Sequence, residues 1–234
     1  MARAYSIQDI LSKKYKTLEW SEPWIKAFSK PETTGVWFIW GNSGNGKSSF
    51  VMQLTKELAK IGPVLYDSLE EGSRMTMRDN LLRAGIMEVK KRVLIASEGI
   101  EDLDARLKKR KSPKFVIVDS IQYSGISFPV YRKFKEAHPD KLIIFISHAN
   151  GKKPASRPAE SVKYDADLKI WVEGFKAISN GRYNPGGEFT IWEAGANKYW
   201  GIQAPEATAA DGGGEASFND EAVAVKKPFK INKA

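Results

Sequence analysis

The feature that most constrains this chain is a glycine-rich run that reads Gly41, Asn42, Ser43, Gly44, Asn45, Gly46, Lys47, Ser48. Its glycines let the backbone curl so that successive N–H groups point at one anion, and Lys47 brings a positive charge to the same place. An apolar, β-prone segment, residues 36–40, precedes the run, and residues 49–58 carry apolar side chains at helical spacing. A strand, this loop and a helix in that order are typical of a phosphate-binding loop. The helix N-terminus at Ser48 and Ser49 adds its own attraction for phosphate.

A second apolar segment, residues 115–118, ends in a single carboxylate, Asp119. Four consecutive apolar residues favour a buried central strand. Downstream of a phosphate loop, a strand of this kind is typical of the Walker B strand, whose aspartate holds Mg²⁺ through water beside the loop hydroxyl. Ser48 and Asp119 are therefore the candidate Mg²⁺ ligands.

Two further predicted strands end in groups that can act on a phosphate. Residues 64–68 are followed by Glu70 and Glu71, and residues 142–146 are followed by Ser147 and His148. In open α/β sheets ligands lie at the carboxyl ends of the strands, so Glu70 or Glu71 is well placed to polarise an attacking water molecule. The alternative is a helix N-terminus that carries acidic residues for its dipole. His148 or Ser147 is a candidate γ-phosphate sensor, with an ordinary hydrogen-bonded histidine as the alternative.

The remaining pattern predicts helices over residues 73–84, 100–111 and 130–138 and a strand over residues 93–96. His138, before a proline, is interpreted as an ordinary turn residue. Residues 167–172 and 188–192 predict two strands around the loop 180–187, which gives a hairpin with Arg182 near its tip.

Residues 150–163 contain two prolines and few apolar groups, and predict a mobile basic loop. Its cations are candidate nucleic-acid contacts, and a solvated surface loop is the alternative. These cations are Lys152, Lys153, Arg157 and Lys163.

Length, charge and composition limit the number of domains, the kind of partner and the location that fit these motifs. A chain of 234 residues suits one sizeable α/β domain with a formal net charge of +9, which favours a polyanionic partner. We expect a lead-in over residues 1–34 whose aromatic residues cover the core, with base stacking as the alternative, and a catalytic domain over residues 35–202. Residues 203–234 predict a disordered tail whose basic end is a candidate docking peptide for a protein partner, or else only solubilises the chain. The absence of cysteine, of a secretory signal and of a membrane-spanning stretch favours a cytoplasmic protein.

Together, these motifs resemble those of the RecA-like ATPases, and most closely the RadA and DnaB-helicase branch. Within that branch the chain resembles an ATPase core without additional domains, of the kind found in phage and mobile-element genomes. The resemblance implies an α/β fold with a central, mostly parallel sheet flanked by helices and a C-terminal β-hairpin. It also implies ATP and Mg²⁺ as ligands, Glu70 as the water-activating carboxylate, and the strand end at Ser147 and His148 as the sensor. Arg182 would reach into a neighbouring subunit of a homo-oligomer, either a hexameric ring or a filament. In that branch the hairpin usually reads Lys-x-Arg, and Asn180 stands in place of the lysine here.

These expectations lead to two hypotheses. The first is an oligomeric ATPase that acts on DNA, single-stranded DNA in particular, in recombination, repair or replication. The second is an ATP-dependent assembly or switch factor that binds a protein partner without DNA-stimulated motor activity. A small-molecule phosphotransferase is disfavoured because the sequence has no compact arginine-rich lid between the Walker strands.

Overall fold

The computed structural model describes residues 4–183 and 186–202, so the predicted tail, residues 203–234, lies outside the described residues. The described part is built on one sheet with the strand order β3-β2-β4-β5-β1-β7-β8-β9, and β6 pairs with the end of β5. The strands are β1 (Gly35–Gly41), β2 (Val64–Ser68), β3 (Val93–Ala96), β4 (Phe115–Asp119), β5 (Leu142–Asn150), β6 (Lys153–Pro154), β7 (Leu168–Glu173), β8 (Lys176–Ser179) and β9 (Glu188–Thr190). The pairs from β3 to β7 along this order are parallel, whereas β8 and β9 are antiparallel additions at one edge.

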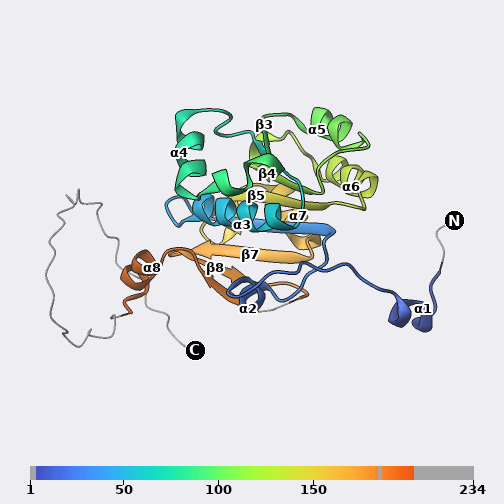
Figure 1. Cartoon of the computed structure of the whole chain (residues 1–234), viewed down its shortest axis with the longest axis horizontal. Helices are drawn as coiled ribbons and strands as arrows, with labels where there is room; N and C mark the ends of the chain where they lie inside the picture. Colours follow the sequence, from blue (N-terminus) through green and yellow to red (C-terminus); the bar gives the residue numbers. More distant parts are fainter. Residues whose placement is uncertain (1–3, 184–185, 203–234) are drawn as a thin grey trace, which may run out of the picture. The chain divides into compact units, whose positions relative to one another are not determined.

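Helices cover both faces of the sheet, so its central strands are buried on both sides (Figure 1). The helices are α1 (Ile7–Ser12), α2 (Trp24–Phe28), α3 (Lys47–Ile61), α4 (Met75–Arg83), α5 (Ile100–Leu107), α6 (Phe128–Ala137), α7 (Arg157–Asp165) and α8 (Glu193–Trp200), with short 3-10 turns at Ile86–Arg92 and Ile121–Tyr123. Residues of α2, α3 and α4 share one buried cluster with Trp37 and Ile39 of β1. Residues of α5, α6 and α7 share the other cluster with Phe38 and Trp40. The alternation along β1 follows from the two-residue period of a strand.

The predicted strands at residues 36–40, 64–68, 93–96, 115–119 and 142–148 are all present in the structure. Three predicted helices are present as α4, α5 and α6, with α5 ending at Leu107 because the basic residues that follow it form a turn. The interpretation of His138 as an ordinary turn residue is incomplete. Its ring is buried beside Phe134, and its Nε2 lies 2.8 Å from Asp104 Oδ1, which ties α6 to α5.

The prediction of a mobile loop over residues 150–163 is wrong. The segment pairs as β6 with the end of β5 and then forms the first part of α7. Ser156 caps this helix by accepting a hydrogen bond from the Ala159 N–H at 3.4 Å, and a proline occupies the first turn, where its missing N–H costs nothing. Ala159 and Val162 are buried against the sheet, which holds the helix in place.

The C-terminal hairpin is present, and the two strands predicted beside it are present as β7 and β9, but the strand between them, β8, was not predicted. The loop 180–187 joins β8 to β9, and β8 first returns along β7 through a two-residue turn at Gly174 and Phe175. Strand β8 was missed because it has only four residues, Lys176–Ser179, too few for its alternating burial to give a clear pattern in the sequence.

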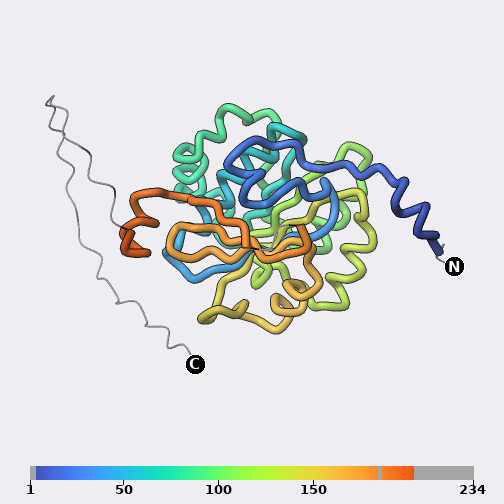
Figure 2. Tube along the Cα trace, turned by 90° about the horizontal axis from the view of Figure 1, so that it is seen from below, coloured from blue at the N-terminus to red at the C-terminus, as the bar shows by residue number. Residues whose placement is uncertain are grey.

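The lead-in divides into two parts. Residues from Thr17 onward join the core, where the chain runs beside the C-terminal strands (Figure 2). Helix α2 lies against β9 and α3, and the ring centroids of Trp24 and Phe189 are 4.3 Å apart. Burial of a large side chain contributes about 2 kcal/mol, so these aromatic residues add materially to stability. The expectation that the lead-in covers the core is wrong for its first part, because α1 buries none of its residues.

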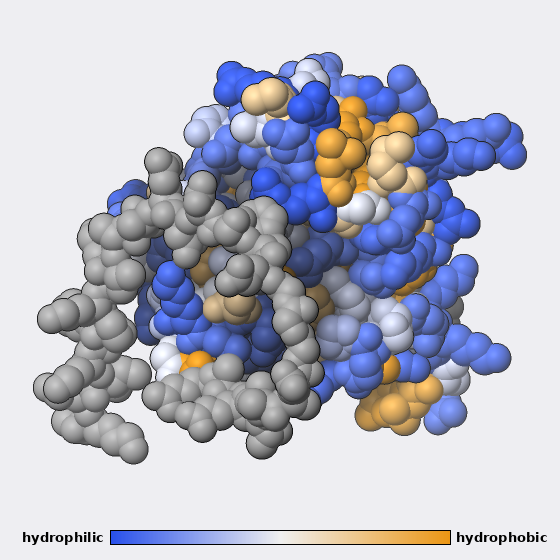
Figure 3. All heavy atoms as spheres, turned by 60° about the vertical axis from the view of Figure 1, so that its left-hand side comes forward, coloured by the Kyte–Doolittle hydropathy of each residue, from blue (hydrophilic) through white to orange (hydrophobic). Residues whose placement is uncertain are grey.

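The face in Figure 3 is mainly hydrophilic, with apolar groups gathered in small patches. Among the described residues, no helix combines the length and the apolar character needed to cross a membrane.

Candidate functional site

The loop over residues 41–48, called the phosphate loop below, joins β1 to α3 at the carboxyl edge of the sheet. Gly41 is required by close packing, since a Cβ there would lie 2.4 Å from the carbonyl oxygen of Val172. Gly46 has φ +91°, a left-handed conformation that favours glycine, and its carbonyl accepts the Phe50 N–H of α3 at 2.9 Å. Lys47 is half-buried at the first turn of the helix, and Ser48 and Ser49 are exposed beside it. The loop is thus open to an anion at a helix N-terminus.

Two asparagine side chains tie the phosphate loop to neighbouring segments. Asn42 Nδ2 donates to the Gly151 carbonyl at 3.1 Å, just beyond β5. Asn45 Nδ2 donates to the Ser43 carbonyl at 3.2 Å, and Asn45 Oδ1 accepts the Gly174 N–H at 2.8 Å. The loop therefore keeps a fixed shape through contacts that the glycine pattern alone does not reveal.

Asp119 lies at the end of β4, opposite Ser68 of β2. The Tyr66 hydroxyl donates a hydrogen bond to Asp119 Oδ2. Burial raises the pKa of Asp119 above its ordinary value, and the neighbouring Glu70 charge acts in the same direction; the Tyr66 hydrogen bond and the Lys47 charge oppose them. A half-buried carboxylate whose charge is partly desolvated is a suitable partner for a cation.

Glu70 is placed beside Asp119 by the backbone, because the Asp119 carbonyl accepts the N–H groups of Leu69 at 2.7 Å and of Glu70 at 3.2 Å. Glu70 Oε2 lies 3.1 Å from His148 Nε2, which connects the end of β2 to β5. Glu71 instead accepts a weak hydrogen bond from Asn80 Nδ2 of α4 at 3.4 Å. Of the two acids, Glu70 is the one in contact with a strand-end residue of the predicted site.

The second sensor candidate, Ser147, is fully buried. Its hydroxyl accepts a hydrogen bond from Gln122 Nε2 at 2.7 Å and donates to the His148 carbonyl at 2.8 Å. The edge of the Tyr123 ring lies near the His148 ring, with centroids 6.5 Å apart. The residues after β4 thus orient the end of β5, and His148 is the more exposed of the two candidates.

A cavity of about 440 Å³ begins at Ser49 and extends between α3, the end of α4, the turn before β8 and the segment after β9. Phe175 and Trp192 form an edge-to-face pair at its wall, with ring centroids 5.0 Å apart. The lining residues are Ser49, Met52, Gln53, Asn80, Arg83, Ala84, Phe175, Ile191 and Trp192.

The structure does not bring Arg182 to this edge. Its Nη1 donates to Asp167 Oδ1 at 2.8 Å, and Asp167 precedes β7, beside the start of β1 at Val36. Arg182 therefore lies at the opposite end of the strands from the phosphate loop of the same chain.

The four basic candidates for nucleic-acid contact lie on β6 and α7 and just before them. Lys152, Lys153 and Arg157 are exposed. Lys163 is half-buried over the Trp40 ring, with Nζ 4.0 Å from the centroid, and burial lowers its pKa. The exposed three are available to a partner, and Lys163 is already engaged within the chain.

Sequence reasoning missed three groups that shape the site, Tyr66, Gln122 and Phe175. Tyr66 gave no separate signal because it lies inside an apolar strand. Its position, two residues before the end of β2, places it opposite Ile117 of β4, the strand that ends in Asp119. Gln122 and Phe175 act through the pairing of distant segments, which no local pattern records.

Comparison with solved structures identifies the class of fold. The chain is similar to the flagellar accessory protein FlaH from Methanocaldococcus jannaschii, with 17% identity and a TM-score of 0.56 over 75% of this chain and 94% of that chain. It is also similar to a second solved structure, an ATPase domain, with 18% identity and a TM-score of 0.48 over 67% of this chain and 80% of that one. No family model matches the sequence, and no match was found among curated proteins. The predicted fold is confirmed: the chain has the RecA-like P-loop fold, with a mostly parallel sheet between helices.

Proposed function

We propose that this protein binds ATP with Mg²⁺ and hydrolyses it at the phosphate loop. The observation that carries the proposal is the meeting of the loop, the half-buried Asp119 and Glu70 at one edge of the sheet. Lys47 supplies positive charge to the β- and γ-phosphates, and the N–H groups at the start of α3 face the same anion. Negative charge that develops as the γ-phosphoryl group leaves is stabilised by these fixed groups.

The residues present fit a magnesium ion. Oxygen ligands suit Mg²⁺, and the raised pKa of Asp119 reflects a partly desolvated carboxyl that a nearby cation would keep ionised. Ser48 would hold the ion through its hydroxyl and Asp119 through water. When bound, the ion would neutralise charge on the β- and γ-phosphates.

Glu70 is proposed as the base. It accepts a proton from the water that attacks the γ-phosphorus, and the bond from that phosphorus to the bridging oxygen breaks. His148 Nε2 lies 3.1 Å from the Glu70 carboxylate, and through this contact it is proposed to respond when the γ-phosphate is lost. Glu71 remains the alternative base, although its contact with α4 turns it to another element.

The cavity that begins at Ser49 is proposed to receive the nucleoside. A base can stack on the aromatic wall of Phe175 and Trp192, and the amides of Gln53 and Asn80 can hydrogen-bond to its edge. The cavity adjoins the helix start that would hold the phosphates, so one ligand can occupy both.

We also propose that the protein works as a homo-oligomer on DNA, single-stranded DNA in particular. Arg182 cannot serve the phosphate loop of its own chain, but a head-to-tail ring or filament would present it to a neighbour. The exposed cations Lys152, Lys153 and Arg157 follow β5, near Asn42 of the phosphate loop, where bound DNA would sense the nucleotide state.

The alternative is a switch factor that binds a protein partner. The observation in its favour is that Lys163 stacks on Trp40 and that residues 150–163 are folded rather than free to wrap a nucleic-acid strand. The predicted docking peptide of this alternative lies in residues 203–234, outside the described residues.

The experiment that separates the two measures ATP turnover with and without single-stranded DNA at two salt concentrations. For a DNA-dependent ATPase we expect stimulation that fades as salt rises, because phosphate contacts weaken steeply with ionic strength. The triple variant Lys152→Ala, Lys153→Ala, Arg157→Ala should lose the stimulation and keep the basal rate. ATP turnover that DNA leaves unchanged would favour the switch factor.

A further inference from the structure

The turn between β7 and β8 binds the phosphate loop through two hydrogen bonds that lie outside the nucleotide-binding pattern. The Gly174 N–H donates to Asn45 Oδ1 at 2.8 Å, and the Phe175 N–H donates to the Asn45 carbonyl at 3.2 Å. Asn45 directly precedes Gly46 and Lys47. The turn therefore fixes the position of Asn45, directly before the residues of the loop that would bind the anion.

This turn has an unusual backbone. Gly174 has φ +52° and Phe175 has φ +59°, and two consecutive positive φ values define the tight hairpin turn that normally carries glycine or asparagine. The phenylalanine is held in this conformation by its surroundings. A Cβ on Gly46 would lie 3.0 Å from its ring, the Trp192 ring packs on it edge-to-face, and its carbonyl accepts the Ile191 N–H at 2.8 Å.

Helix α8 contacts the same turn and lies beside the ends of β7 and β8 (Figure 1). Trp200 Nε1 donates to the Gly174 carbonyl at 3.0 Å, and the Tyr199 hydroxyl donates to Glu173 Oε1 at 3.2 Å. A Cβ on Gly174 would lie 2.2 Å from the Tyr199 ring, so only glycine permits this packing. The N–H of Gly174 thus reaches the phosphate loop while its carbonyl reaches α8.

We propose that α8 positions the phosphate loop through the Gly174–Phe175 turn, so that the docking of α8 sets the affinity of the protein for nucleotide. Asn45 and Trp200 are the positioning residues at the two ends of this connection. The inference rests on the nucleotide binding proposed above. Any event that moves α8 would therefore change the affinity of the phosphate loop for nucleotide. By thermodynamic reciprocity, a bound nucleotide would stabilise the docked position of α8.

The first test is a double-mutant cycle on the dissociation constant of Mg-ATP, measured by calorimetry. Trp200→Phe removes the indole N–H and keeps an aromatic ring, and it should weaken ATP binding several-fold, up to about tenfold, as expected for one lost hydrogen bond. In an Asn45→Ala background the same substitution should have a much smaller effect, because both variants act through one turn.

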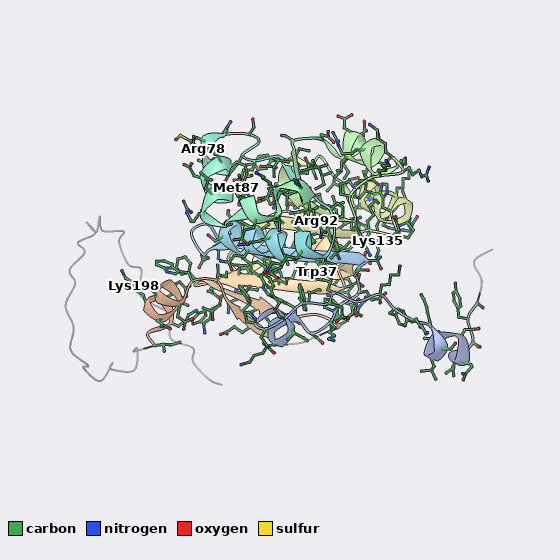
Figure 4. All side chains as sticks on the ribbon, in the orientation of Figure 1. Trp37, Arg78, Met87, Arg92, Lys135 and Lys198 are labelled. Atoms are coloured by element: carbon green, nitrogen blue, oxygen red, sulfur yellow. The ribbon has the colours of Figure 1, made fainter. Side chains whose placement is uncertain are left out.

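Two matched controls accompany the cycle. Lys198→Ala changes an exposed residue of α8 that projects from the helix in Figure 4, and it should leave the affinity unchanged. Asn42→Ala changes an asparagine of the phosphate loop that bonds to Gly151 instead of the turn, so Trp200→Phe should keep its full effect in that background. An unaltered affinity in Trp200→Phe, or full additivity with Asn45→Ala, would overturn the proposal.

A second test needs no nucleotide. Hydrogen exchange of the peptide that covers residues 41–48 should be faster in Trp200→Phe than in the unmodified protein and in Lys198→Ala. Equal exchange would overturn the positioning role of α8 whether or not ATP binds. Faster exchange in a protein that binds no ATP would instead refute the proposed function and leave the connection between α8 and the loop standing.

Discussion

Lys47 has the clearest role at the scale of single residues. Burial raises the pKa of Asp119, and the Lys47 charge partly offsets this rise, so the two groups interact. We predict that Lys47→Ala weakens ATP binding at least about tenfold, because a charge-assisted contact to phosphate is lost. Calorimetric titration with Mg-ATP measures this loss. Lys56→Ala is the control on the same helix, since Lys56 pairs with Glu88 at 2.8 Å, and equal effects of the two variants would contradict the assignment.

Asp67 gives a prediction about pH. It is fully buried, its Oδ1 accepts the Glu98 N–H at 2.8 Å, and burial raises its pKa to about 6. Because the folded state then binds a proton more tightly than the unfolded chain, this group lowers the free energy of unfolding as pH rises from about 4 through 6. Between pH 5 and pH 8 the ionisation of Asp67 lowers the free energy of unfolding by about 1 kcal/mol.

The measurement is urea unfolding of the protein and of Asp67→Asn at both pH values. The free energy of unfolding of Asp67→Asn, taken relative to that of the unmodified protein, should be higher at pH 8 than at pH 5. An identical dependence on pH in both proteins would show that Asp67 does not titrate in this range.

Single residues were predictable where their chemistry is local. The loop glycines, Lys47 and Asp119 follow from short patterns. The partners that tune them do not, since the Tyr66 hydroxyl meets Asp119 only through the pairing of β2 with β4, and Asn45 meets Gly174 only through the placement of β7.

At the scale of elements, α7 shows what composition conceals. The charges and prolines of residues 150–163 resemble a loop, yet Ser156, a proline in the first turn, and the buried pair Ala159 and Val162 make a capped amphipathic helix. Whether a short helix forms depends on its caps and on a few buried contacts, and the overall composition of the segment shows neither.

The cap itself gives a prediction. Ser156→Ala should lower the free energy of unfolding by about 1 kcal/mol, because the Ala159 N–H loses its acceptor. Denaturant unfolding at constant m-value measures the change. Ser161→Ala, on the exposed side of the same helix, is the control, and an equal loss in both variants would contradict the capping role.

At the scale of the whole molecule, the central strands were predictable because each is a continuous apolar run, whereas their order in the sheet depends on long-range pairing that no such run records. At the antiparallel edge β7 and β9 were predicted and β8 was missed, since β8 is short and the turn before it carries Phe175 where glycine or asparagine is usual. Long-range pairing, more than local propensity, decides such edges.

The first residues supply a prediction at this scale. None of α1 is buried, and the antiparallel contact of Thr17 with Glu32 begins only after it. A chain that starts at Lys13 should keep its melting temperature within about 2 °C, because little apolar area is lost. Thermal unfolding followed by circular dichroism tests this, and a fall of many degrees would show that the α1 segment belongs to the core.

The most direct test of the central claim is single-turnover hydrolysis of Mg-ATP by the unmodified protein, by Glu70→Gln and by Glu71→Gln, with the dissociation constant of each measured alongside. We predict that Glu70→Gln binds ATP as the unmodified protein does and loses at least about a hundredfold in rate, in line with the loss of a general base, whereas Glu71→Gln keeps most of its rate. Full hydrolysis by Glu70→Gln, or no binding of ATP by the unmodified protein, would contradict the account.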